Sequence, residues 1–320
     1  MPKRPIVILP VLALGLAGCG QLTDESGNGV LEGPLELIVP YAAGGGTDNT
    51  ARQLASAAED TCGVSTVITN QEGSGGGTGF QAAADATPDG TTIGVVSVEL
   101  AMLEHQDIAS VSPADLTGLL QYNFDAAAFT VSESSEFESI HDVIDAADSG
   151  EGITVGTSGA GSIWEVSAAG LAQEEGIELN YAPFNGAAPA ITAVLGDQVE
   201  ATSASGAEVL GQVQSNELNA LAVMGEERLE ALPDTPTLTE EGIDWISGTW
   251  RGLAVPNDTP DEIVAELESC ITEAAESEAF TSFMEENAFG QEYRDSAEFN
   301  EFMDSEYERY EDLIAGLGNG

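Results

Sequence analysis

Apolar and polar positions alternate in a regular order through the first third of the chain. Apolar runs at 35–40, 64–69 and 92–98 have the length and composition of buried strands. Glycine-rich turns follow the first two runs and lead into predicted helices, one ending near Glu59 and one at 80–86. This order of strand, turn and helix is typical of α/β proteins with parallel strands.

A long apolar segment at 116–131 is predicted to be extended and to cross between two parts of the molecule. A second series follows, with predicted helices at 140–147, 163–175 and 188–195 and predicted strands at 153–156, 179–184, 199–203 and 218–224. A last strand is predicted at 250–255. Asp258-Thr259-Pro260 then begins a helix, and the acidic remainder is predicted to be helical.

Two such series joined by long connections predict an α/β protein with two lobes, each a mostly parallel sheet flanked by helices. We assign residues 35–125 and 250–320 to lobe 1 and residues 126–249 to lobe 2. The C-terminal part thus completes the N-terminal lobe.

The first residues have the features of a secretory signal. Lys3 and Arg4 precede an apolar run at 6–17, which is too short to span a bilayer, and Leu16-Ala17-Gly18-Cys19 resembles a lipobox. We expect residues 1–18 to be a signal peptide and Cys19 to carry the lipid, with 19–34 as a flexible tether. The alternative is a plain signal peptide with a chance cysteine. Either reading predicts an extracytoplasmic protein, and the lipid would anchor it to the outer face of the cell membrane.

Cys62 and Cys270 remain as an even pair in an oxidising compartment. A disulfide bond between them would tie the C-terminal part of the chain to the N-terminal lobe. The alternative is two buried thiols.

Charge excludes several partners. The chain has 56 acidic residues against 7 basic ones, and Lys3 is the only lysine. Such a surface repels nucleic acid and anionic headgroups, so we expect no nucleic-acid partner and membrane contact through the lipid anchor alone. The regular apolar segments argue against disorder. The charge therefore indicates a halophilic protein, in which counterions screen the repulsion between carboxylates.

Three glycine-rich turns at 44–48, 73–79 and 156–162 each follow a strand and precede a helix. Backbone N–H groups at such helix starts attract anions, and Thr47, Thr78, Ser158 and Ser162 add hydroxyl donors. One turn alone would be an ordinary tight turn, but three together favour anion binding at the carboxyl ends of the strands.

Other chemistries have weaker signals. No turn ends in Gly-Lys-Ser/Thr or has G-x-G-x-x-G spacing, and histidine and cysteine do not cluster, so we expect no nucleotide, cofactor or metal. Ser158 lies in a sequence close to G-x-S-x-G, but His105 and His141 both precede it, which makes a serine hydrolase the less favoured alternative. Arg251 could meet a ligand carboxylate or pair with an acidic residue near the hinge, and Arg52 is predicted to pair with Asp48.

Several stretches resemble the substrate-binding proteins of tripartite tricarboxylate transporters, the TctC/Bug family. The similar stretches are 39–48 with Ala51-Arg52, Asn70 with 73–79, Pro88-Asp89-Gly90, 155–162, 184–190 with 195–199, and 232–237. Ser205-Gly206 and Trp250-Arg251-Gly252 are similar to the tricarboxylate-type branch.

This resemblance implies a periplasmic-binding-protein-like fold that closes on a di- or tricarboxylate without catalysing a reaction. It implies a monomer that delivers its ligand to membrane permease subunits, and the alternative output is a sensor that feeds a signalling system. The implied ligand-binding residues, with Arg251 added from the reasoning above, are Tyr41, Ala43, Gly46, Thr47, Asp48, Gly77, Thr78, Gly79, Ser158, Ser162, Ser203, Ser205 and Arg251. The chain departs from the family at Gln71-Glu72, Asn185 and Asn219, where Arg-Pro, Lys, and Arg or Lys are frequent.

Overall fold

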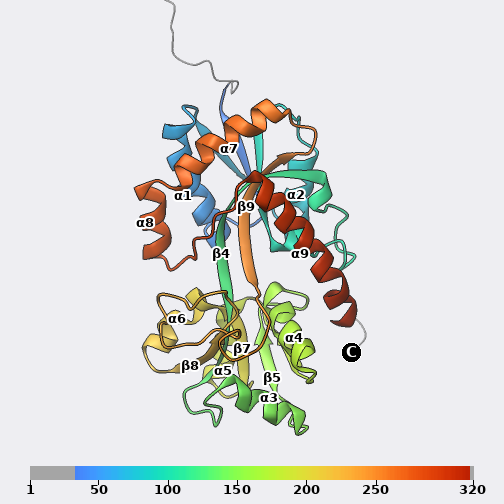
Figure 1. The fold of residues 1–320 in the computed structure, drawn as a ribbon, viewed down its shortest axis with the longest axis vertical. Coiled ribbons are helices and arrows are strands. Elements are labelled where there is room, and N and C mark those ends of the chain that lie inside the picture. The colour runs from blue at the N-terminus through green and yellow to red at the C-terminus, as the bar shows by residue number, and fades with distance from the viewer. Residues whose placement is uncertain (1–32, 318–320) are drawn as a thin grey trace, which may run out of the picture.

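The computed structural model describes residues 33–317, and it has two lobes joined by a pair of long strands (Figure 1). The predicted signal peptide, Cys19 and nearly all of the predicted tether lie outside the described residues. One mixed sheet runs through both lobes in the order β2-β1-β3-β9-β4-β7-β5-β6, and β8 pairs with β4 off this path.

Lobe 1 begins with three parallel strands, β1 (Leu35–Val39), β2 (Thr66–Asn70) and β3 (Thr92–Ser97). Helices α1 (Gly46–Thr61) and α2 (Gly77–Ala84) connect them, with short 3-10 helices at η1 (Ser74–Gly76), η2 (Val98–Ala101) and η3 (Pro113–Asp115). The last part of the chain returns to this lobe as α7 (Asp261–Ala275), α8 (Glu278–Glu286) and α9 (Ser296–Leu317).

Lobe 2 has the same strand and helix alternation. Its elements are α3 (Ile140–Asp148), β5 (Thr154–Thr157), α4 (Ile163–Glu175), β6 (Asn180–Pro183), α5 (Ala187–Leu195), β7 (Ala201–Ser205), α6 (Gly206–Gln214) and β8 (Leu218–Val223). β5 pairs parallel with β6 and β7.

Two antiparallel strands, β4 (Leu116–Ser132) and β9 (Gly248–Pro256), connect the lobes. The predicted crossing at 116–131 is therefore confirmed as a single 17-residue strand. The predicted lobe boundaries fall inside β4 and β9, so paired strands and not flexible linkers join the two halves (Figure 1).

The direction of these central strands differs from the expected mostly parallel sheet. β4 runs antiparallel to β7, β8 and β9, and β3 also pairs antiparallel with β9. The parallel pairs that the strand–helix alternation predicted are the outer ones. The strands that return from the other lobe enter the sheet in the opposite direction, which makes it mixed.

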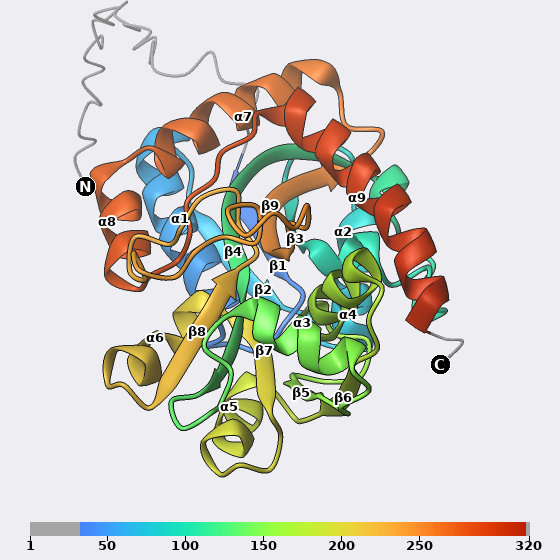
Figure 2. The same ribbon diagram turned by 60° about the horizontal axis from the view of Figure 1, so that its bottom comes forward.

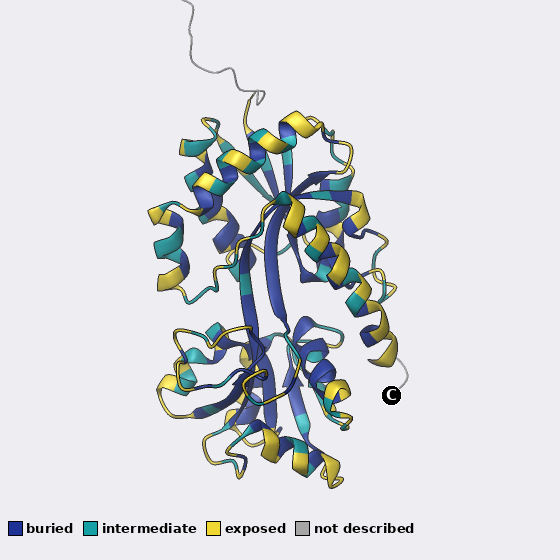
Figure 3. Ribbon diagram, in the orientation of Figure 1, coloured by how far each residue is buried: buried dark blue, intermediate teal, exposed yellow. Residues whose placement is uncertain are grey.

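Helices flank both halves of the sheet, and the central strands between them are buried (Figure 3). In lobe 1, α1, α7 and α8 pack on one face through Leu54, Leu267 and Phe280, and α2 and α9 pack on the other through Phe80 and Phe299. In lobe 2, α3 and α4 cover one face and α5 and α6 the other. β4 and β9 are almost entirely buried, as expected for strands with helices on both sides.

Helix α9 passes beside α2 and reaches α4 of lobe 2 (Figure 2). Near its end, Arg309 donates a hydrogen bond from Nη1 to the backbone oxygen of Ile246 at 2.9 Å, just before β9 begins. The Arg309 guanidinium also lies 5.0 Å from the ring centroid of Trp245. The C-terminal helix thus contacts the segment through which β9 leaves lobe 2.

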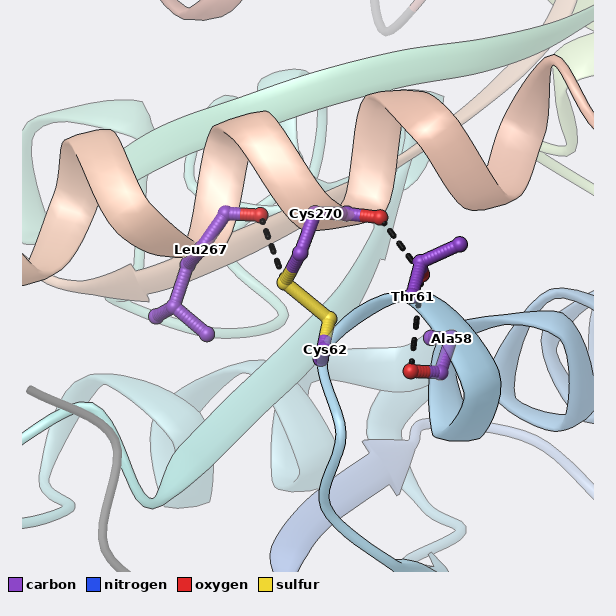
Figure 4. The surroundings of a disulfide bond; sticks show 5 residues. All are labelled: Ala58, Thr61, Cys62, Leu267 and Cys270. Atoms are coloured by element: carbon purple, nitrogen blue, oxygen red, sulfur yellow. Dashed lines mark hydrogen bonds between the residues drawn. A yellow bond between two sulfur atoms is a disulfide. The ribbon is translucent and has the colours of Figure 1, made fainter. Parts of the chain in front are cut away.

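Cys62 and Cys270 form a disulfide bond between the C-terminal end of α1 and the middle of α7 (Figure 4). Thr61 adds a hydrogen bond from its hydroxyl to the backbone oxygen of Cys270 at 2.8 Å. The two cysteines are 208 residues apart in sequence, and in the chain-entropy model a loop of this length gives a stabilisation of about 5 kcal/mol at most. Both helices belong to lobe 1, so the bond leaves the lobes free to move relative to each other.

Candidate functional site

A cavity of about 500 Å³ lies between the lobes, beside the crossing strands. Both lobes contribute to its wall. The lining residues are Tyr41, Gly45, Gly46, Thr47, Glu99, Asp125, Ile163, Trp164, Ser205, Ala207, Glu208, Thr249, Arg251, Asn287 and Phe289. This volume is in the range of small-molecule sites.

The N-terminus of α1 forms one wall of the cavity. Gly45 is the N-cap, and it is followed by Gly46 and Thr47, all three on the cavity lining. The first backbone N–H groups of a helix have no acceptor within the helix, and the helix dipole is positive at that end. This wall is therefore suited to an anionic group.

Asp48 holds this loop in place from behind. Its carboxylate accepts hydrogen bonds at 2.8 Å from the backbone N–H of Gly44, from Nε of Arg52 and from the side-chain amide of Asn70. The predicted pair between Arg52 and Asp48 is thus present. Burial raises the pKa of Asp48, but the hydrogen bonds from Arg52, Asn70 and Gly44 outweigh it and leave the pKa below its ordinary value.

Arg251, on β9, is the guanidinium of the cavity and is only 9% exposed. Its Nε donates to Thr47 Oγ1 at 2.9 Å, and its Nη1 donates to Asp125 Oδ2 at 2.6 Å and to the side-chain oxygen of Asn123. Burial lowers the pKa of Arg251, but the adjacent Asp125 carboxylate outweighs this and raises it above its ordinary value. The side chain is therefore a fixed positive charge.

One nitrogen of Arg251 remains available to a ligand. Within the described part of the chain, Nη2 has no hydrogen-bond partner, and it is not among the buried atoms that lack one. It lies 3.4 Å from the position that a Cβ atom on Gly46 would take. Arg251 thus places one free NH2 group beside the start of α1, where this group and the helix N–H groups together can bind one carboxylate.

Asp125 is held by the loop that follows α8. The backbone N–H of Gly290 donates to Asp125 Oδ1 at 2.9 Å, and the Asn123 side chain donates to the same atom at 2.9 Å. Phe289, next to Gly290, lines the cavity 5.9 Å from the Arg251 guanidinium. This loop therefore positions both the acidic partner and the aromatic cover of Arg251.

Tyr41 and Glu99 form another part of the lobe 1 wall. The Tyr41 hydroxyl donates to Glu99 Oε2 at 2.8 Å, and the Ser97 hydroxyl donates to the same oxygen at 2.6 Å. Burial and the neighbouring Glu99 raise the pKa of Tyr41 well above its ordinary value. Tyr41 therefore stays a neutral phenol, and its one proton is donated to Glu99.

Lobe 2 presents the starts of α4 and α6 to the cavity. Ser205 and Glu208 form a capping box at α6: the backbone N–H of Glu208 donates to Ser205 Oγ at 3.2 Å, and the backbone N–H of Ser205 donates to Glu208 Oε2 at 3.3 Å. Ile163 and Trp164, at the start of α4, add an apolar surface. Lobe 2 thus offers a second helix N-terminus and an aromatic side chain.

Of the ligand-binding residues predicted from sequence, the cavity lining contains Tyr41, Gly46, Thr47, Ser205 and Arg251. The others lie outside this lining: Ala43, Asp48, Gly77, Thr78, Gly79, Ser158, Ser162 and Ser203.

Packing accounts for the small residues of the second glycine loop. A Cβ atom on Gly79 would lie 2.6 Å from Cα of Pro40, and one on Gly77 would lie 2.7 Å from Cβ of Ala109. Gly79 thus lets α2 approach the residue that follows β1, and Gly77 lets it approach the loop after η2. Ser203 is buried in β7, and its hydroxyl has no hydrogen-bond partner among the described atoms.

Sequence reasoning missed Glu99, Asp125, Trp164 and Phe289, all of which line the cavity. The position of Asp125 could have been used to find it. It lies on the segment predicted to cross between the lobes, and Arg251 lies on the strand predicted to return. Glu99 and Phe289 had no such signal, because only the folded chain brings η2 and the loop after α8 to the same cavity.

Within residues 33–317, neither histidine is hydrogen-bonded to Ser158. The ring nitrogen Nε2 of His105 lies 2.9 Å from the backbone oxygen of Tyr307, and that of His141 lies 3.1 Å from the backbone oxygen of Glu241. Neither contact involves Ser158, so the geometry gives the hydrolase alternative no support. Within residues 33–317, the histidine, cysteine and acidic side chains form no group of three or more that could hold a metal ion.

Comparison with known proteins gives consistent matches. The family model of the tripartite tricarboxylate transporter family receptor matches residues 50–319. Protein BugT of Bordetella pertussis is 26% identical over 278 residues, which cover 85% of each chain. The crystal structure of a TctC solute binding protein from Polaromonas, without ligand, superposes with a TM-score of 0.82 at 32% identity and covers 88% of this chain and 98% of that one.

Two structures from Rhodopseudomonas palustris share the fold at 23% identity. MatC with bound malate has a TM-score of 0.71 and covers 88% of this chain and 98% of its own. A second protein, with adipate, has a TM-score of 0.74 and covers 89% of this chain and 97% of its own. The matched family consists of transporter receptors, and the Polaromonas neighbour is a solute binding protein, so the family is one of binding proteins and not enzymes, located outside the cytoplasm.

Proposed function

The chain belongs to the tripartite tricarboxylate transporter receptor family, and from this premise we propose that it captures a small organic carboxylate between its two lobes. The protein then delivers this ligand to the permease subunits of a transporter of the same type. Lipidated Cys19 anchors it to the outer face of the cell membrane, although that residue lies outside the described part. Within residues 33–317, no helix combines the length and the apolar content that a bilayer span requires.

One observation carries the proposal: the start of α1 and the free nitrogen of Arg251 face the same interlobe cavity. The chain has only 7 basic residues against 56 acidic ones, so its far field repels anions. A fixed guanidinium beside unpaired helix N–H groups supplies local attraction at this point, and the low-dielectric wall strengthens it.

The ligand class follows from this geometry and from the related structures. Two neighbours were solved with malate and adipate, which are both small dicarboxylates. The cavity of about 500 Å³ is large enough for molecules of this size. We therefore extend carboxylate binding to this chain, with one carboxylate at Gly46, Thr47 and Arg251.

Ligand binding favours the closed arrangement of the lobes, because the cavity wall comes from both of them. A hydrogen bond between the lobes, away from the crossing strands β4 and β9, supports a closed arrangement. The Gln106 side chain donates to the backbone oxygen of Gly161 at 2.7 Å, which joins a loop of lobe 1 to the turn before α4. Lobe closure would present a defined surface to the permease.

Gly46→Ala tests the carboxylate site directly. The new methyl group would lie 3.3 Å from the Phe289 ring and 3.4 Å from Arg251 Nη2, in the space assigned to the carboxylate. We expect isothermal titration with a panel of small carboxylates, at high salt, to show an affinity loss of about tenfold or more. Backbone strain does not complicate the test, because Gly46 lies in helix α1 and alanine favours helices.

Gly211→Ala is the matched control, since its Cβ atom would meet nothing within 4 Å inside α6. This variant should bind as the wild type does. Equal affinities for all three proteins would contradict the assigned site. Binding of neutral amide analogues as tight as that of the carboxylates would contradict the ligand class.

A further inference from the structure

The charges around the cavity are unexpected for a site that takes a di- or tricarboxylate. Its lining contains three carboxyl groups, those of Glu99, Asp125 and Glu208, and one guanidinium, that of Arg251. A ligand with a carboxylate at each end would place its second negative group among acidic side chains. The three carboxyl groups differ in how many of their oxygens accept hydrogen bonds from the protein and in how exposed they are.

Two of the three are engaged by structural partners. Asp125 accepts hydrogen bonds from Arg251, Asn123 and the backbone of Gly290. Glu208 is the acidic member of the capping box at α6, and its Oε2 accepts from the backbone and hydroxyl of Ser205. These contacts engage both oxygens of Asp125 but only Oε2 of the exposed Glu208, whose Oε1 has no hydrogen-bond partner among residues 33–317.

Glu99 is less exposed than Glu208. Its Oε2 accepts from Tyr41 and Ser97, whereas its Oε1 has no hydrogen-bond partner among residues 33–317. This oxygen is not one of the buried atoms that lack a partner, so it remains accessible, and Glu99 lines the cavity. Because Tyr41 and Ser97 both act as donors toward Oε2, they fix the carboxyl group in one orientation.

We propose that Glu99 is a specificity-determining residue. One carboxylate of the ligand is held by Gly46 and Arg251. At the other end of the ligand, Glu99 selects for a hydrogen-bond donor, which is either a hydroxyl or an ammonium group. The inference rests on the proposed function and narrows it. The lobe 1 wall offers a free donor at Arg251 Nη2 and a free acceptor at Glu99 Oε1, so a ligand with both kinds of group satisfies both.

A ligand with a second carboxylate at that end would meet Glu99 as a like charge. Such repulsion inside a partly enclosed cavity is screened less than at the surface. Discrimination therefore comes from one attractive contact and one repulsive contact at the same oxygen.

The test compares ligands of equal length that differ at one end. At each chain length of four, five and six carbons, three linear acids are compared. They are the dicarboxylate, the ω-hydroxy acid and the ω-amino acid. Isothermal titration of the wild type at high salt should rank at least one donor-bearing acid above its dicarboxylate by about tenfold or more. The hydroxy and amino arms show which donor is preferred.

Glu99→Gln is the decisive variant, because the amide keeps the size of the side chain and removes the repulsion. It should raise affinity for the dicarboxylates relative to the donor-bearing acids by about tenfold. Glu174→Gln is the matched control: Glu174 is an exposed residue of α4 outside the cavity lining, and the change in net charge is the same. Its ligand ranking should equal that of the wild type.

Dicarboxylates that bind the wild type more tightly than their donor-bearing partners would overturn this inference, even if Glu99→Gln fails to fold. An unchanged ranking in folded Glu99→Gln would also overturn it. In both cases carboxylate binding itself, and with it the proposed function, would stand. If none of the acids binds, both proposals fail together.

Discussion

At the scale of single residues, Arg251 does two things at once. It neutralises the buried Asp125 carboxylate, and its remaining nitrogen faces the cavity. Removal of the side chain would leave Asp125 unpaired in the interior, which typically costs about 3–5 kcal/mol. Loss of binding in such a variant would therefore not separate stability from recognition, and neighbouring residues give cleaner tests.

Thr47 is one such neighbour, because its hydroxyl accepts the Nε hydrogen bond of Arg251 at 2.9 Å. Thr47→Val keeps the shape and removes this acceptor, so Arg251 is oriented less firmly. One hydrogen bond contributes about 0.5–1.5 kcal/mol, so carboxylate affinity should fall by about twofold to tenfold.

Thr78→Val provides the comparison for this titration. Thr78 is exposed and lies outside the cavity lining, so its variant should bind with unchanged affinity. A loss in Thr78→Val with none in Thr47→Val would move the site to the second glycine loop.

Sequence alone could point to two parts of the cavity lining, the start of α1 and Arg251. The first is a glycine and threonine turn after a strand, and the second is a single arginine on a late strand. Both features can be seen in the local sequence. It could not predict Glu99. That residue lies in η2, and its relation to Arg251 depends on the pairing of β3 with β9. Nothing in the neighbourhood of either residue encodes that pairing.

At the scale of elements, the strands and helices of the α/β units were predicted within a few residues. Helix α6 was not predicted, although Ser205 and Glu208 have the spacing of a capping box. Local periodicity also cannot give strand direction. The antiparallel course of β4 and β9 follows from the chain crossing between lobes and returning, which is a property of the whole topology.

At the scale of the whole molecule, the excess of 56 acidic over 7 basic residues should make folding depend on salt. The Debye length is about 10 Å at 0.1 M and about 3 Å at 1 M, so molar salt screens neighbouring carboxylates that repel at low salt. We expect Tm to rise steeply with NaCl over this range. Differential scanning calorimetry at each concentration measures the change.

A charge-reduced variant serves as the control for this experiment. Glu308, Glu311 and Asp312 are exposed on α9, and their replacement by the corresponding amides removes three negative charges. The slope of Tm against salt should become smaller. A wild-type Tm that is equal at low and molar salt would contradict the halophilic interpretation.

The most direct measurement is a crystal structure with the tightest-binding carboxylate. Our account predicts carboxylate oxygens within about 2.7–3.2 Å of the backbone nitrogens of Gly46 and Thr47 and of Arg251 Nη2, with lobe 2 residues closing over the ligand. A ligand bound elsewhere, or one whose carboxylate faces away from the start of α1, would contradict it.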